Sequence, residues 1–179
     1  MHLPLIPMPL IPVAPHQGGF GAVRKHNIHE GVDLYVAEGA PVFDIEAGEI
    51  TEVDLFTGAM VGTPWWNETW AVLVEGDSGG IVYGEIEPAS GLHPGLRVNE
   101  GVRLGTVVRV LKADKGLPTS MLHIELHLPR CRDVWDGWYV GSERPQGLLD
   151  PTSLLLKCVE LAKGNNVLLE TPLPPIRLP

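Results

Sequence analysis

Cysteine is scarce in this sequence of 179 residues: Cys131 and Cys158 are the only two, and they form no Cys-x-x-Cys pair. A small secreted domain held together by disulfides needs several closely spaced cysteines, so that class is excluded. A zinc site built from paired thiolates is excluded for the same reason. The spacing leaves open whether the two thiols form one disulfide or stay unpaired.

Positive charge and long apolar runs are also lacking. Lys and Arg number 13 against 22 Asp and Glu, which gives a formal net charge of −9 with no basic run. A nucleic-acid-binding domain would show a basic patch, so no nucleic-acid partner is expected. No apolar run approaches the roughly 20 residues of a transmembrane helix, so no membrane span is expected.

The N-terminus is apolar but does not have the pattern of a signal peptide. It lacks a basic start, and prolines interrupt the segment that would have to be helical. The sequence therefore predicts a protein that is cytoplasmic as synthesised. If it acts outside the cell, another component delivers it, and assembly into a phage virion is one such route.

Proline and glycine are abundant instead, with 17 and 21 residues. Both favour turns, and they separate short runs of β-forming residues such as Val32–Val36 and Trp70–Glu75. Many short strands with few helices predict an all-β fold of antiparallel sheet. One short C-terminal helix is expected, because Asp150-Pro151-Thr152-Ser153 is a typical helix start and Gly164 a typical stop.

The prolines concentrate at both ends, which predicts three segments: an N-terminal Pro-rich arm over residues 1–20, a folded domain over 21–163 and a C-terminal Pro-rich arm over 164–179. Pro4-Leu5-Ile6-Pro7 and its near-copy Pro9-Leu10-Ile11-Pro12 predict extended, polyproline-like backbone. Such a segment either lies along the protein's own surface or docks into a groove of a protein partner at low entropic cost.

Metal-ligating side chains are spaced in a suggestive way. His29 and Asp33 are both common zinc ligands, and Gly31 between them allows a tight backbone path on which they converge. A third ligand is needed, and the alternating segment Met121–Leu128 offers His123. Because side chains alternate between the faces of a strand, His123 shares one face with Met121, Glu125 and His127.

These residues occur in the order of a known family. The sequence resembles the M23 metallopeptidases, the lysostaphin- and LytM-type peptidoglycan endopeptidases, over roughly residues 24 to 153. The matching motifs are His29-Glu30-Gly31-Val32-Asp33, Glu38-Gly39-Ala40-Pro41-Val42, Ala47-Gly48-Glu49-Ile50, Val98–Gly105, His123-Ile124-Glu125 and Asp150-Pro151. The resemblance implies a LytM-like twisted antiparallel sheet with a barrel-sandwich-like core, and one Zn ion held by His29, Asp33 and His123.

Two departures from the family pattern affect the expected activity. The family has a histidine in each of the slots taken here by Met121 and by Glu85, which lies two residues after Tyr83. By this mapping the metal ligands are kept and both catalytic histidines are lost. A thioether cannot transfer a proton, and the loss of one preorganised donor costs about two to three orders of magnitude in rate.

Three functions follow from this pattern. The first is an M23-like zinc-binding domain with lost or reduced peptidase activity and a binding or structural role, with peptidoglycan or a peptide as ligand. The second is an active zinc metalloendopeptidase in which Glu85 is the general base, as a glutamate is in other zinc peptidases. His127 is then expected to donate to a bound oxyanion. The third is a component of a phage particle or assembly that docks through its Pro-rich arms.

Contacts with the substrate are expected from side chains around the predicted metal site. Trp65 and Trp66 lie in a loop of the kind that forms a groove wall in the family, and aromatic side chains suit peptide or glycan contact. Tyr83 lies two residues before the altered position Glu85, and Met121 occupies the other altered position. We therefore expect Trp65, Trp66, Tyr83 and Met121 to contact the substrate.

Overall fold

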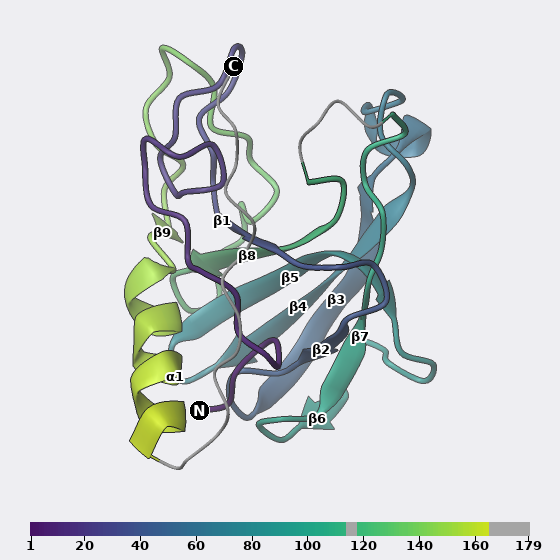
Figure 1. Cartoon of the computed structure of the whole chain (residues 1–179), viewed down its shortest axis with the longest axis vertical. Coiled ribbons are helices and arrows are strands. Elements are labelled where there is room, and N and C mark those ends of the chain that lie inside the picture. Colours follow the sequence, from purple (N-terminus) through teal and green to yellow (C-terminus); the bar gives the residue numbers. More distant parts are fainter. Residues whose placement is uncertain (114–117, 165–179) are drawn as a thin grey trace.

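A computed structural model describes residues 1–113 and 118–164 and confirms the predicted all-β fold (Figure 1). Nine strands and two helical segments follow one another within these residues. In order they are β1 (Val32–Tyr35), β2 (Pro41–Phe43), β3 (Gly48–Thr57), the 3₁₀ turn η1 (Ala59–Val61), β4 (Thr69–Gly76), β5 (Gly79–Pro88), β6 (Arg97–Val98), β7 (Arg103–Val107), β8 (Met121–His127), β9 (Leu148–Leu149) and α1 (Thr152–Gly164).

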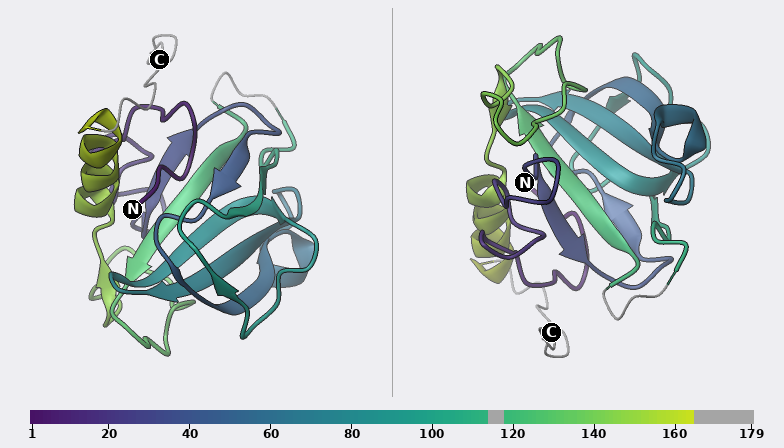
Figure 2. Two further views of the ribbon diagram at one scale, coloured as in Figure 1. Left: turned by 90° about the horizontal axis from the view of Figure 1, so that it is seen from below. Right: turned by 90° about the horizontal axis from the view of Figure 1, so that it is seen from above.

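The strands form one open, twisted sheet in which every pairing is antiparallel (Figure 2). Its main order is β1-β8-β5-β4-β3-β6, while β7 pairs with both β2 and β5, and β9 pairs with β8. Strand β8 therefore lies between β1 and β5. Its residue His123 is opposite Asp33 on one side and Gly84 on the other, and this register brings distant parts of the sequence to one point.

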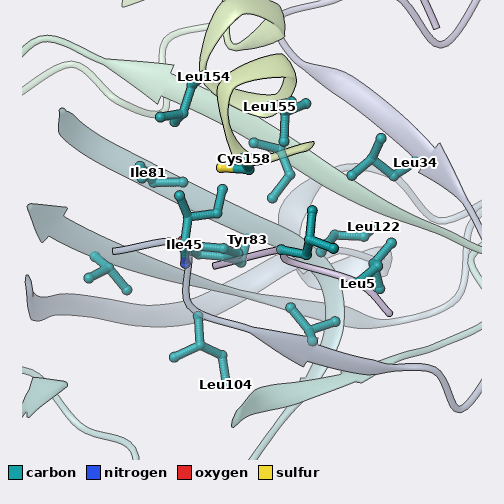
Figure 3. Packing of buried hydrophobic residues seen from close by; sticks show 14 of the residues in the cluster. Leu5, Leu34, Ile45, Ile81, Tyr83, Leu104, Leu122, Leu154, Leu155 and Cys158 are labelled. Carbon is teal, nitrogen blue, oxygen red and sulfur yellow. The ribbon is translucent and has the colours of Figure 1, made fainter. Parts of the chain in front are cut away.

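Strand β8 is buried on both faces, and the two faces differ in character. Leu122, Ile124 and Leu126 belong to the main hydrophobic core, together with Leu154 and Leu155 of α1 (Figure 3). The opposite face carries Met121, His123, Glu125 and His127, as the alternation of the sequence predicts. The core thus holds the polar face of β8 in a fixed position.

The predicted C-terminal helix is present as α1, and it starts as expected: the backbone N–H of Thr152 donates to Oδ1 of Asp150 over 2.8 Å. Its residue Cys158 is buried in the core, whereas Cys131 is half-buried elsewhere. Both thiols are free in the described part of the chain. No helix within residues 1–113 and 118–164 has the length and apolar character needed to cross a membrane.

The N-terminal segment lies against the domain. The side chains of Leu3, Leu5 and Met8 are buried in the main core, and the backbone N–H of Phe43 in β2 donates to the carbonyl of Pro4 over 3.0 Å. Docking of this segment onto a partner stays a prediction that rests on its exposed residues, and Leu10 and Val13 are the most exposed of its large apolar side chains. The C-terminal arm lies outside the described residues, apart from Gly164.

A buried carboxyl group lies within the core. Tyr83 on β5 has no exposed surface, and its hydroxyl donates to Oδ1 of Asp44 over 2.8 Å while accepting the backbone N–H of Ile45. Oδ2 of Asp44 has no partner among the described residues. Burial raises the pKa of Asp44 to about 7, an effect that the hydrogen bond from Tyr83 only partly offsets.

The Asp44 carboxyl predicts a pH-dependent stability. An aspartate of an unfolded chain ionises near pH 4, so between about pH 4 and pH 7 the folded state holds a proton that the unfolded state has released. The free energy of unfolding therefore falls as pH rises through this window. Asp44→Asn removes the titration, so we expect the variant to gain stability relative to the parent between pH 4 and pH 8, on the order of 1–2 kcal/mol.

Urea denaturation of both proteins at a series of pH values measures this difference. Asp54→Asn, at an exposed position of β3, is the matched control. A stability difference between Asp44→Asn and the parent that stays constant over pH 4–8 would contradict the prediction.

Candidate metal centre

The three predicted metal ligands meet in the structure. Asp33 is on β1, His29 lies just before this strand, and His123 is on the neighbouring β8. Oδ1 of Asp33 is 2.8 Å from Nδ1 of His123 and 3.1 Å from Nε2 of His29, and the two imidazole nitrogens are 3.2 Å apart. All three side chains are buried. These residues form one group with the spacing of a metal site.

The size of this triangle fits zinc. Ligand atoms at 2.0–2.1 Å from a tetrahedral zinc ion lie about 3.3 Å apart, close to the three separations found here. The outer ring nitrogens support the same assignment: Nδ1 of His29 is 3.0 Å from the carbonyl of Gly19, and Nε2 of His123 is 2.8 Å from Oε1 of Glu125. When each outer nitrogen carries the proton and donates it, the inner lone pairs of both rings converge on one point.

Asp33, the carboxylate among the three predicted ligands, is held ionised. Burial opposes ionisation of Asp33, but the hydrogen bonds of His123 and His29 outweigh it and lower the pKa of this carboxyl far below its usual range. Its other oxygen, Oδ2, accepts a hydrogen bond of 2.8 Å from Nη2 of Arg24. Sequence reasoning missed Arg24, although it lies in the same stretch, because nothing in the spacing says that its guanidinium turns back to Asp33.

Gly31 is required by the packing around His123. A Cβ atom at this position would lie 2.3 Å from the carbonyl oxygen of Ile124 and 2.8 Å from Nε2 of His123. Such distances are far inside van der Waals contact, so any side chain would displace β8 and the imidazole. The glycine between the two ligands therefore makes room for the third.

Glu85 reaches the same region through an irregularity in β5. Trp70 pairs with Ile86 and Val72 with Tyr83, so β5 has one residue more than β4 over this interval. Such an extra residue is a β-bulge, and Glu85 has a left-handed backbone with φ of 65°. At this point β5 also changes its partner, from β8 at Gly84 to β7 at Ile86. The bulge turns the carboxyl group of Glu85 to the polar side of the sheet.

The Glu85 carboxyl group is buried, and its Oε2 has no hydrogen-bond partner among the described residues. Burial, with the negative charge of Asp33 as a second cause, raises the pKa of Glu85 to about 8. Glu85 and Asp33 line one pocket, together with Met121 and Trp66. The structure thus brings two expected substrate contacts and the expected base to the side of the metal ligands.

Two other expected contacts lie elsewhere. Tyr83 was expected to face the substrate, but its side chain is completely buried in the core. The reason is the bulge, which places Tyr83 and Glu85 on opposite faces although they are two residues apart. Trp65 is 62% exposed and stacks edge-on against Trp66, but it does not line this pocket.

His127 contacts the site only indirectly. Its Nε2 is 2.9 Å from Oε2 of Glu125. The other oxygen of this carboxylate, Oε1, is hydrogen-bonded to Nε2 of His123, so Glu125 bridges the two imidazoles. Burial opposes ionisation of Glu125, but these two hydrogen bonds lower its pKa to about 2. His127 was expected to donate to an oxyanion at the metal. Its position behind Glu125 instead makes it a support for the predicted ligand His123.

An aromatic ring covers the other side of His123. The ring of Phe56 on β3 lies 5.4 Å from that of His123, and it occupies the space above Gly84, where a Cβ atom would be 2.6 Å from the ring. Sequence reasoning missed Phe56, because its place depends on the pairing of β3 with β4 and of β4 with β5.

Comparisons with known proteins address the fold. No family model matches the sequence, and a comparison with curated proteins finds no match. Among solved structures, a putative peptidase M23 from Pseudomonas aeruginosa superposes with a TM-score of 0.50 at 16% identity, over 87% of this chain and 49% of that one. The protein has an M23-like fold. The chain spans about half of the Pseudomonas structure.

Two further solved structures match with lower TM-scores. Cbpa from L. salivarius REN has a TM-score of 0.48 and 19% identity, over 75% of this chain and 77% of that one. Lysostaphin has a TM-score of 0.47 and 17% identity, over 73% of this chain and 44% of that one. The M23-like fold predicted from the sequence motifs is thus confirmed by the Pseudomonas comparison, at the level of the fold.

The bridge through Glu125 predicts a measurable effect on metal affinity at the candidate metal centre. Glu125→Gln puts an amide N–H₂ where one of the two histidines now donates, so one imidazole must turn or change its tautomer. We expect zinc affinity to fall about 10- to 100-fold, as is typical when a partner of a ligating histidine is lost. Competition with a chromogenic chelator measures it.

His127→Gln is the conservative comparison, because its amide can still donate to Glu125. This variant should keep most of the affinity. Equal zinc affinity of Glu125→Gln and the parent would show that the bridge does not orient His123.

Proposed function

We propose that the protein is an M23-like zinc-binding domain that binds a peptide or peptidoglycan ligand and has lost or reduced peptidase activity. The observation that carries the proposal is the pair of groups beside the ligand triangle: the thioether of Met121 and the carboxyl group of Glu85. Both occupy slots that are histidines in the family that the sequence resembles. Zinc bound by His29, Asp33 and His123 would supply Lewis acidity toward a carbonyl group.

The chain's own residues support ligand binding better than hydrolysis. Met121 can neither accept nor donate a proton, and it is buried beside the pocket. Arg24 fixes Asp33, and Glu125 fixes His123, so the ligands are rigidly held. A binding domain needs fixed metal-ligating side chains but no pair of side chains that transfer protons.

The test uses the purified, zinc-loaded protein with insoluble peptidoglycan and with glycine-rich peptides. We expect the protein to sediment with peptidoglycan, and we expect no release of new amino groups from either substrate. Hydrolysis that requires zinc and disappears in His123→Ala would overturn the proposal.

The second candidate is an active zinc endopeptidase with Glu85 as general base. One observation favours it: the bulge turns the unpartnered Glu85 carboxyl group into the pocket that Asp33 also lines. A general base must lie within reach of the proton that it accepts, and a raised pKa suits this role. In this case Glu85→Gln should abolish hydrolysis while the zinc content stays unchanged.

A further inference from the structure

A pocket next to the metal centre has walls that are mostly apolar. We call it the Trp66 pocket and define it by its apolar lining of Tyr35, Trp66, Val110, Leu111 and Met121. Its polar lining includes Glu85, Asp33 and Arg24. Its volume of about 430 Å³ is in the range of pockets that bind small molecules. Met121 contributes to this apolar character at a position where the resembled family has a polar imidazole.

The wall of the pocket is built before any ligand arrives. Trp66 forms a β-bridge with Leu111. The next residue, Asn67, makes two hydrogen bonds to the residues just before Leu111. Its backbone N–H donates to the carbonyl of Val110 over 2.8 Å, and its side-chain amide donates to the carbonyl of Arg109 over 2.9 Å. These bonds hold Trp66 and Leu111 side by side, so a ligand meets a rigid apolar surface.

One polar group of the pocket, the carboxyl group of Glu85, lacks a partner among the described residues. The Glu85 side chain is more than nine-tenths buried, and its Oε2 makes no hydrogen bond within the described residues. A buried carboxyl group without a partner is costly, and a ligand that supplies one regains that energy. A peptide amide is well suited, because its N–H pairs with a carboxylate oxygen and its carbonyl accepts a bond from a protonated carboxyl group.

These observations together identify a ligand class. We propose that the Trp66 pocket binds a bulky apolar side chain of a peptide, with the adjoining amide bonded to Glu85, and that it discriminates against glycine. The inference rests on the proposed binding function and specifies its ligand. A glycine segment would leave the wall of Trp66, Leu111 and Met121 in contact with water and would gain nothing from burial.

Isothermal titration of the zinc-loaded full chain with three blocked tripeptides tests the inference. The peptides are acetyl-Gly-Leu-Gly-amide, acetyl-Gly-Phe-Gly-amide and acetyl-Gly-Gly-Gly-amide. Because burial of a Leu or Phe side chain is worth a factor of about 10 to 100 in affinity, the first two should bind at least tenfold tighter than the third. Equal affinities, or no binding of any peptide, would overturn the inference.

Substitutions in the wall of the Trp66 pocket test whether the preference for the leucine peptide arises there. Leu111→Ser and Trp66→Ala should each reduce the preference for the leucine peptide at least threefold, which corresponds to partial loss of one apolar contact. Met60→Ser, at an exposed position of η1 outside the pocket, is the control and should preserve it. Thermal unfolding of each variant verifies folding, and a preference unchanged in folded Leu111→Ser and Trp66→Ala would overturn the inference.

The readouts separate this inference from the proposed function. If the protein binds zinc and sediments with peptidoglycan but does not distinguish the peptides, the inference fails and the proposed function stands. If the protein prefers the leucine peptide but cleaves it in a zinc-dependent reaction, the inference stands and the loss of peptidase activity is refuted.

Discussion

His123→Ala is expected to weaken zinc binding by more than about 100-fold. Nδ1 of His123 lies 2.8 Å from Asp33 and 3.2 Å from His29, so its removal opens one corner of the ligand triangle. Losing only an outer partner of a ligand costs about 10- to 100-fold, and losing the ligand costs more. Inductively coupled plasma mass spectrometry of the purified variant and competition with a chelator measure the loss.

The same change should remove the stabilisation that zinc gives. A ligand present at about 1,000 times its Kd adds about 4 kcal/mol to the free energy of unfolding, which raises the Tm of a domain of this size by roughly 10 °C. We expect the parent to show this rise on zinc addition and His123→Ala to show none. His93→Ala, at an exposed loop position, is the matched control and should respond like the parent. A zinc-dependent rise in His123→Ala would place the metal elsewhere.

Glu85→Gln is expected to stabilise the metal-free protein at high pH. The pKa of Glu85 is raised from 4.5 to about 8 in the folded chain, so between these values the folded state holds a proton that the unfolded state has lost. The free energy of unfolding therefore falls as pH rises from about 4.5 to about 8. The amide cannot ionise, so the variant escapes this loss, which we expect to be on the order of 2–3 kcal/mol.

Chemical denaturation in the presence of a chelator, at intervals from pH 5 to pH 9, measures the effect. The chelator matters because a bound cation would favour the ionised carboxylate. Glu87→Gln is the control, since Glu87 is on the same strand but exposed. If the difference in free energy of unfolding between Glu85→Gln and the parent does not grow with pH, then the Glu85 carboxyl group is hydrated in solution.

Much of the fold could be predicted because it depends on local patterns. Alternation along Met121–His127 gave the two faces of β8, and Asp150 before α1 gave the start of the helix. In both cases the signal lies within a few residues of the feature that it predicts. The set of His29, Asp33 and His123 has another origin, because residues 29 and 123 lie far apart in the sequence: it followed from a family resemblance carried by several motifs that recur in order along the chain.

The misplaced side chains have a common physical reason. Tyr83 and Glu85 should share a face in a regular strand, and the sequence contains no sign of the extra residue that separates them. The bulge arises where β5 changes from β8 to β7, which is a property of the assembled sheet. The N-terminal segment is a related case: its pattern predicts an arm that lies along the protein or docks onto a partner, and only the folded core shows that Leu3 and Leu5 are buried.

The left-handed backbone of Glu85 limits how this site can be redesigned. At φ of 65°, β-branched side chains such as valine or threonine clash with their own backbone, whereas glycine, asparagine, aspartate and histidine tolerate this conformation. A combinatorial library at this position should therefore recover few β-branched members, whatever function is selected. The shape of the main chain restricts the choice of chemistry next to the metal centre before any side-chain contact is considered.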